Sequence, residues 1–249
     1  MARKKQTALL RAKGRLRVRD APLHGAPHHE AESKPRKQGS LILRSPPKAG
    51  VSTDEEPRAH ALYRLMAWLS PSYPVGAFSY SSGIEWAVEA ADIKDAQGLR
   101  RWLTVVVAQG GGFCDAVLFA QAYRSLADPD DGPLRAVAEL AAALAPSKER
   151  FLETTAQGEA FIAATRAAWP CDALDRLRAA FDGPVAYPVA VGVAAAGHGI
   201  AVGPALHAFL HAVAANLISA GVRLIPLGQS DGQRVLAALE PVVAATAER

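Results

Sequence analysis

The segment "SKERFLETTAQGEAFIAATRAAW", residues Ser147–Trp169, repeats its apolar and small side chains with the period of an α-helix. The positions that share one helical face are Phe151, Thr155, Gly158, Phe161, Ile162 and Thr165. A glycine in the middle of such a face lets the backbone of a neighbouring helix approach closely. The segment therefore predicts a long helix that packs tightly against another one.

The same helical period continues on both sides of this segment. Turn sequences such as "DPDDGP" (128–133) and "DGP" (182–184) separate the periodic stretches. We expect further helices over 58–69, 78–91, 95–106 with Asp95 as the cap, 115–126, 134–144, 185–196, 206–217 and 233–247. No convincing alternating strand and no internal repeat interrupts this pattern. The sequence thus predicts a single all-α domain of about eight to ten helices over residues 58–249.

The sequence predicts the buried face and the ends of the first two helices in more detail. Spacings of three and four residues predict that the buried face of the first helix consists of Leu62, Leu65, Met66 and Leu69. This helix should end before Pro71, because the residue before a proline avoids the α region. We expect the second helix to start around Phe78, with Ser79 or Ser81 as its cap, and to run past Trp86.

Positive charge is concentrated at the start of the chain. Residues 1–50 contain 13 Lys and Arg against 3 Asp and Glu, whereas residues 51–249 contain 15 against 21. This first part lacks periodic apolar residues and is broken by proline and glycine, so we expect residues 1–57 to form a disordered basic extension. A nucleic-acid-binding arm, a membrane-surface patch or a transit peptide are the alternatives to a solvated extension without a partner.

Catalytic and metal sites find little support in the sequence. The chain has two cysteines, Cys114 and Cys171, far apart, so a disulfide framework or zinc site is not expected, and a reducing, cytoplasmic location is the default. His207 and His211 share a helix face, but no third ligand is identifiable. No phosphate-binding loop and no Gly-x-Ser-x-Gly elbow is present. We therefore predict no catalytic residue, no cofactor and no dedicated metal site, and we expect no membrane span in the apolar run 186–222, which prolines and histidines interrupt.

Two junctions between helices contain more polar and aromatic residues than a simple turn requires. They are "SPSYPVGAFSYSSGIEW" (70–86) and "RLIPLGQSDGQRVL" (223–236), both rich in polar and turn-forming residues. Pro74 and Gly76 can turn the chain, but the aromatic rings beside several hydroxyl groups are typical of recognition surfaces. We predict that partner contacts involve Tyr73, Phe78, Ser79, Tyr80, Glu85, Arg223, Gln229, Asp231, Gly232 and Gln233.

The same two junctions resemble the two signature stretches of the urease accessory protein UreF family. The similarity extends over about residues 62–241 and includes "YPVAVGVAAAGHGI" (187–200) between them. The resemblance implies an all-α, non-enzymatic chaperone that forms a homodimer. It also implies assembly with UreD (also called UreH), the GTPase UreG and apo-urease, for delivery of nickel to the urease active site. In that assembly the nucleotide belongs to UreG.

The sequence departs from the family pattern at two places. The family often has Glu-x-Arg at the start of the long middle helix, whereas this chain has Arg150 directly after Glu149 and Phe151 at the usual arginine position. Tyr187 stands where many relatives have histidine. Small-residue faces around Gly158 and in Val185–Ala196, together with the resemblance, suggest the surface of a two-fold dimer.

Two other functions compete with this one. A helical nucleic-acid-binding protein would use the basic extension for phosphate contacts, although the acidic balance of residues 51–249 disfavours it. A helical enzyme would need a site assembled from distant residues, such as Glu85 with His198. Substrate turnover that is lost on replacing either residue would distinguish the enzyme.

Overall fold

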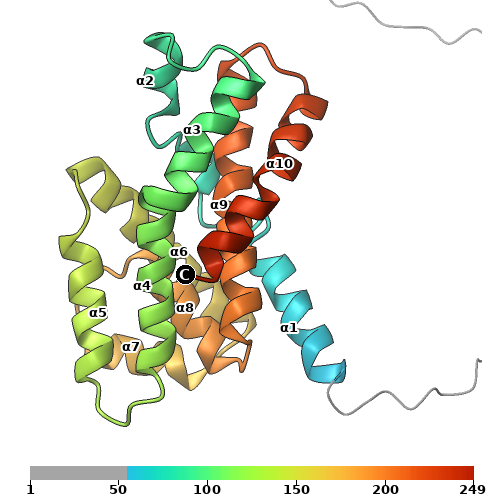
Figure 1. The fold of residues 1–249 in the computed structure, drawn as a ribbon. Coiled ribbons are helices and arrows are strands. Elements are labelled where there is room, and N and C mark those ends of the chain that lie inside the picture. Colours follow the sequence, from blue (N-terminus) through green and yellow to red (C-terminus); the bar gives the residue numbers. More distant parts are fainter. Residues whose placement is uncertain (1–54) are drawn as a thin grey trace, which may run out of the picture. The chain divides into compact units, whose positions relative to one another are not determined.

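Helices form nearly all of the regular structure in the computed structural model, which describes residues 55–249 (Figure 1). They are α1 Glu55–Trp68, the 3-10 helix η1 Ala77–Ser79, α2 Ile84–Glu89, α3 Ala96–Gln109, α4 Gly111–Ser125, α5 Gly132–Ala143, α6 Lys148–Ala168, α7 Asp172–Ala180, α8 Tyr187–Gly197, α9 Val202–Leu224 and α10 Gln229–Ala247. No strand occurs within this range, so the predicted all-α class is confirmed. Residues 1–54 of the expected basic extension lie outside the described part, and α1 begins three residues before the predicted boundary.

Helix α8 lies at the centre of the packing. Its residues Pro188–Ala195 are all buried, and it packs against α4, α6 and α7. Figure 1 shows α8 behind α4 in the middle of the helical body. This helix contains only small or β-branched side chains after its first two residues, so neighbours on several sides can approach its backbone.

Two glycines permit the closest of these approaches. A Cβ atom added to Gly158 on α6 would lie 2.0 Å from the carbonyl oxygen of Val185, just before α8. A Cβ added to Gly192 on α8 would lie 2.5 Å from the carbonyl oxygen of Phe119 on α4. The tight contact predicted at Gly158 is therefore confirmed, although its partner is the extended segment that leads into α8.

The backbone of that extended segment is hydrogen-bonded by α6. Glu159 Oε1 accepts from the N–H of Val185 at 2.9 Å, and Thr154 Oγ1 accepts from the N–H of Tyr187 at 3.2 Å. These bonds satisfy donors that would otherwise be buried without a partner. Side chains of α6 thus guide the chain into α8.

An aromatic cluster joins the end of α1 to this centre. Trp68 is fully buried, with its ring centroid 6.0 Å from that of Phe161 and 5.1 Å from that of His198. Trp169 and Tyr73 complete the cluster, and the Tyr73 hydroxyl is 2.8 Å from Thr165 Oγ1 on α6. The loop that follows α1 is therefore anchored at its beginning.

The predicted cap of α3 is confirmed. Asp95 Oδ1 accepts from the N–H of Gly98 at 2.7 Å. Helix α6 has a cap that was not predicted, Ser147, whose hydroxyl accepts from the N–H of Arg150 at 3.2 Å. The apolar stripes of α3 and α9 are buried or half-buried as expected.

The predicted face of α1 is partly wrong. Leu65 is buried, but Leu62 and Met66 are 59% and 67% exposed, and Trp68 takes the central place in the core instead. Apolar spacing alone identifies a helix but does not say how wide its buried face is. As a result, α1 presents an apolar surface to solvent.

Three helix assignments also change. The helix expected over 78–91 is wrong at its start, because η1 and α2 are separate and the N-cap of α2 is Gly83, without a serine side-chain cap. Helix α7, which the sequence analysis did not assign, buries Leu174 and Leu177. Helix α10 begins at Gln229 rather than Gln233, so much of the second junction is helical.

Two apolar helical stretches are long enough to cross a membrane by length and composition alone. They are Ala96–Ser125, which includes α3 and α4, and Val202–Leu224, which is α9. Both contribute residues to the core, and α9 packs against α10, α4 and α3. This packing buries part of their apolar surface.

Replacing Gly158 by alanine should destabilise the fold by about 3 kcal/mol, because backbone atoms on both sides would have to move. Urea unfolding followed by circular dichroism measures the change. Gly203→Ala is the matched control, since nothing lies within 4 Å of its added Cβ, and this variant should be neutral or slightly stabilised. Equal stability of the two variants would contradict the inferred contact.

Candidate functional site

The loop from Ser70 to Gly83 connects α1 to α2 and contains the 3-10 helix η1. Gly76 has φ 71°, as a left-handed turn requires, and Gly83 has φ 86°. Ser82 also has a positive φ of 48°, which is uncommon for a residue with a side chain. The expected turning role of Gly76 is therefore confirmed, and a second left-handed turn follows at residues 82–83.

Two side chains of α9 hold the middle of this loop. Asn216 Nδ2 donates to the carbonyl oxygen of Ala77 at 2.9 Å, and Arg223 Nη2 donates to the carbonyl oxygen of Phe78 at 2.9 Å. Both bonds go to the backbone of η1, so they fix the path of the loop without using its side chains. The Phe78 ring remains 66% exposed. An exposed ring on a restrained backbone is suited to contact another protein, because less conformational freedom is lost on binding.

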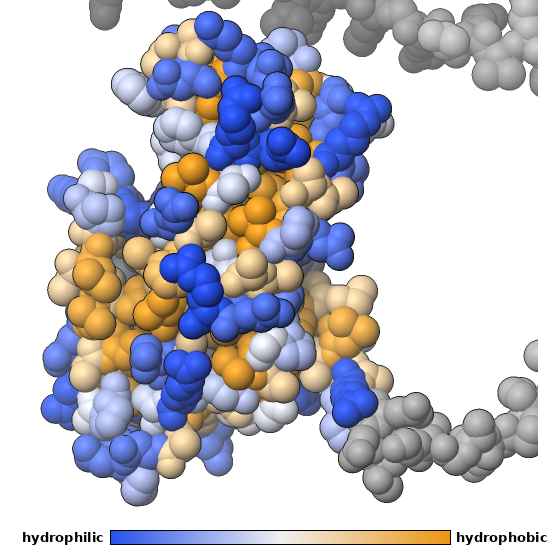
Figure 2. All heavy atoms as spheres, viewed as in Figure 1, coloured by the Kyte–Doolittle hydropathy of each residue, from blue (hydrophilic) through white to orange (hydrophobic). Residues whose placement is uncertain are grey.

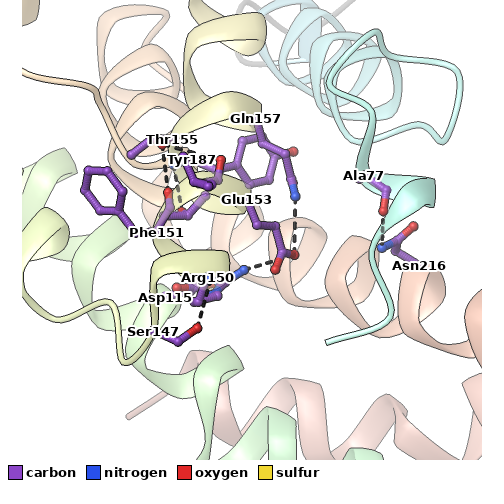
Figure 3. Close-up of polar contacts among 12 residues, drawn as sticks. Ala77, Asp115, Ser147, Arg150, Phe151, Glu153, Thr155, Gln157, Tyr187 and Asn216 are labelled. Atoms are coloured by element: carbon purple, nitrogen blue, oxygen red, sulfur yellow. Dashed lines mark hydrogen bonds and ion pairs between the residues drawn. The ribbon is translucent and has the colours of Figure 1, made fainter. Parts of the chain in front are cut away.

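The loop forms one wall of a groove of about 870 Å³. The other walls come from the start of α4, the α5–α6 junction, the segment 186–188 and the middle of α9. In Figure 3 the labelled α6 residues lie on one side of the groove, and the Ala77–Asn216 hydrogen bond lies on the other side. Apolar side chains such as Leu118, Phe209 and Val213 make up much of the lining.

A charged network lies in the groove. Arg150 Nη2 is 2.5 Å from Asp115 Oδ2, and Arg150 Nη1 is 3.1 Å from Glu153 Oε1. Gln157 Nε2 donates to the same Glu153 oxygen at 3.4 Å (Figure 3). Burial raises the pKa of Asp115, while the guanidinium of Arg150 opposes this effect. The network therefore holds two carboxylates against one cation in a partly dehydrated place.

The network includes the arginine of the first departure from the family pattern. Arg150 points into the groove, whereas Phe151 is half-buried and its ring is turned away from the network in Figure 3. The second departure, Tyr187, lies in the groove lining, where burial raises the pKa of its hydroxyl. Its ring packs against Phe161 and Phe209.

The residues predicted for partner contacts are only partly brought together. Those that line the groove are Tyr73, Phe78, Ser79 and Tyr80. Tyr73 and Tyr80 are half-buried, and the Tyr73 hydroxyl is bonded to Thr165, so Phe78 and Ser79 present the most exposed part of this set. Glu85 is exposed on α2, outside the groove lining.

The second predicted set lies at the junction of α9 and α10. Arg223 contacts the loop, as described above. Gln229 and Gln233 are exposed, whereas Asp231 Oδ2 accepts from the N–H of Gly228 at 3.2 Å at the start of α10. Gly232 is buried, and its added Cβ would lie 3.0 Å from a methyl group of Val222. Gly232 therefore serves helix packing, and the exposed members of this set are Arg223, Gln229 and Gln233.

Histidine and cysteine side chains do not gather into a metal centre. Within residues 55–249, no group of three or more His, Cys, Asp or Glu is placed to hold a metal ion. His207 Nδ1 is 3.0 Å from the carbonyl oxygen of Gly203, and His198 Nε2 is 3.1 Å from that of Trp169. Cys114 is exposed in the groove lining, and Cys171 is half-buried elsewhere.

Sequence reasoning missed several residues of this site. They are Asn216, Asp115, Arg150, Glu153 and Gln157. Asn216 carried a signal, because it is a polar residue in the apolar stretch of α9, and an amide that is even partly buried there needs a hydrogen-bond partner. The charged residues carried none, since the 35 residues that separate Asp115 from Arg150 hide their pairing.

The sequence of this chain is similar to sequences of known proteins. A sequence model of the UreF family matches residues 93–240. A protein of Rhodopseudomonas palustris strain HaA2 named urease accessory protein UreF is 59% identical over 203 residues, which cover 82% of this chain and 86% of the relative. The chain belongs to the UreF family. A Bradyrhizobium diazoefficiens UreF is 61% identical over 209 residues, covering 84% of this chain and 86% of the relative, and one from Bradyrhizobium sp. strain BTAi1 is 62% identical over 189 residues, covering 76% and 78%. The resemblance inferred from the two junctions is therefore confirmed.

Removing both restraints should free the loop from Ser70 to Gly83 in this UreF-family protein. In Asn216→Ala/Arg223→Ala we expect faster hydrogen exchange of the Ser79 and Tyr80 amides, which bond within the turn. The free energy of unfolding should fall by about 1–3 kcal/mol for the two lost bonds together. Hydrogen exchange with mass spectrometry measures the first effect. His211→Ala, an exposed change on α9, is the control, and unchanged loop exchange in the double variant would contradict the restraint.

Proposed function

We propose that this chain is a urease accessory protein that assembles with UreD (UreH), the GTPase UreG and apo-urease to deliver nickel to the urease active site. The supporting observation is membership of the UreF family together with an exposed aromatic ring, Phe78, on a restrained loop. In this proposal the chain is not an enzyme, holds no cofactor of its own and acts in the cytoplasm. Nickel passes through the assembly as cargo.

Phe78 and Ser79 are proposed to contact UreG. An exposed aromatic ring beside a hydroxyl can fill an apolar pocket and still hydrogen-bond at its edge. Arg223 supports this surface through the Phe78 carbonyl, and Gln229 and Gln233 extend polar groups from the adjoining start of α10. Glu85 adds a negative charge on α2 and is proposed as a peripheral contact.

The nucleic-acid alternative gains no support in the described part of the chain. Residues 51–249 carry more acidic than basic side chains, and the relatives are named urease accessory proteins. A phosphate-binding surface needs clustered Lys and Arg. The arginines 150, 176 and 178 are instead paired with carboxylates.

A homodimer is also proposed, but not through the faces first suggested. Gly158 packs against the segment Val185–Tyr187, and Pro188–Ala195 are buried in a helix that packs against α4, α6 and α7, so that basis for the dimer is wrong. Exposed apolar side chains offer other surfaces: Leu62, Tyr63 and Met66 on α1, and Val117, Leu140 and Leu144 on or beside α4 and α5. Figure 2 shows apolar residues gathered over α4 and α5 and on α1. Such surfaces are typical of sites where proteins associate.

Truncating the exposed ring tests the recognition surface. Phe78→Ala should weaken capture of UreG by the UreD-bound protein by about 1–3 kcal/mol, if the ring is a central anchor, and should reduce nickel-dependent urease activation. Tyr80→Ala should have a smaller effect on capture, because half of that side chain is already packed. Pull-down and urease assays measure both, with circular dichroism as a folding check.

Trp86→Ala provides the matched control, since this ring on α2 is also 66% exposed but lies outside the groove lining. Normal capture and normal urease activation by folded Phe78→Ala and Tyr80→Ala would show that the loop is only a turn.

The dimer should persist without the basic extension. We expect light scattering to give twice the 26.2 kDa chain mass for the full protein, and a dimer again for residues 58–249. Two variants distinguish the candidate surfaces. If α1 forms the interface, replacing Leu62 and Met66 by serine should give a monomer. If α4 and α5 form it, Leu140→Ser should do so. A monomer at micromolar concentration, with UreD also present, would refute the dimer.

A further inference from the structure

The groove is larger than expected beside a loop that only connects two helices. Its volume of about 870 Å³ is in the range of sites that bind peptides or small molecules. The loop, α6 and α9 face one another across it, and apolar side chains such as Leu118 and Val213 line much of its wall. Water in such a place gains few hydrogen bonds, so an apolar group that displaces it would bind favourably.

The charges in the groove lining are mostly negative. Asp115, Glu149 and Glu153 supply three carboxylates, and Arg150 is the one cation among the described residues of the lining. Arg150 is already shared between Asp115 and Glu153, as Figure 3 shows for the Glu153 contact. Carboxylates that are partly removed from water are costly unless paired, so the groove offers a place for a second positive charge.

We propose that the groove binds a polypeptide segment of a protein partner that carries one bulky apolar side chain and one Lys or Arg. The apolar side chain would occupy the wall between the loop and α9, and the cation would contact Glu149 and the Asp115–Glu153 pair. This inference rests on the proposed function, since it takes the protein to be part of an assembly. It assigns to the groove a role that is separate from that of the exposed Phe78 ring.

The position of the groove favours a partner protein as the source of this segment. The loop is at once a wall of the groove and the carrier of exposed Phe78, so a protein that contacts Phe78 is beside the groove opening. The apolar lining continues directly into this exposed ring. Continuity of this kind lets one partner insert a side chain while it covers the loop.

Filling the groove from within tests its role. Ala212 lines the groove on α9 and is half-buried, so Ala212→Trp should occupy the space of the apolar side chain. We expect capture of the UreD and UreG partners by this variant to weaken at least tenfold. His211→Trp adds the same ring to an exposed neighbour outside the lining and should leave capture unchanged. Equal capture by both variants, with both folded, would overturn the proposal.

The same capture assay separates this inference from the proposed function. If Phe78→Ala loses capture and Ala212→Trp does not, the groove proposal fails and the function stands. If neither change affects capture, the proposed recognition loop fails as well. If Ala212→Trp does not fold, Ala215→Leu on the same wall takes its place, since it fills less space.

Removing carboxylate charges from the groove tests whether it binds a Lys or Arg of the partner. Glu149 is exposed, so Glu149→Gln should leave the fold intact, and combined with Asp115→Asn it should weaken capture about tenfold and reduce its dependence on salt. Glu240→Gln, an exposed change on α10 outside the groove, is the control. Unchanged affinity and unchanged salt dependence in a folded double variant would overturn the cationic part of the proposal.

Cys114 allows the occupant to be identified, because it is exposed in the groove lining. In a Cys171→Ser background, a benzophenone maleimide on Cys114 should crosslink, in the assembled complex, to a partner segment that contains Lys or Arg. Mass spectrometry locates the crosslinked residues. Crosslinks to a second copy of this chain, to its own residues 1–54, or to a partner segment without a basic residue would each overturn the proposal.

Discussion

The close approach of α6 and α4 to the chain around α8 is the constraint on which the rest of the structure depends. It is possible because Gly158 and Gly192 leave room for carbonyl oxygens of the facing segments. Once α8 is enclosed, α6 must run past it for most of its length, and the aromatic cluster around Trp68 has a fixed place to pack. Small residues here therefore determine the position of large ones elsewhere.

The position of the loop and of the groove follows from that arrangement. The start of α6 carries Arg150 and Glu153 into the groove, and its far end supplies Thr165 to the hydroxyl of Tyr73. The loop is thus attached to α6 at one point and to α9 at two others, through Asn216 and Arg223. Each attachment uses a helix whose position is set by burial, so the site is built on rigid elements.

Sequence reasoning went far with the fold and less far with the site. Helix period and the local cap at Asp95 are read from neighbouring residues, and they predicted most helices correctly. The width of a buried face is decided by other helices, which is why Leu62 was misplaced. Helix α7 was missed because its nine residues give only a short repeat of apolar positions. The groove depends on contacts between distant segments, so its charged network could not be predicted from spacing.

The attachment of the loop through backbone carbonyls has an evolutionary consequence. Every residue type has a carbonyl group, so Asn216 and Arg223 would hold η1 in place whatever side chains stood at positions 77 and 78. Mutation at those two positions can therefore alter what the loop recognises without first weakening how it is held. A lineage that acquires a slightly different partner could follow it by drift in the loop alone, while the scaffold stays under its own separate selection.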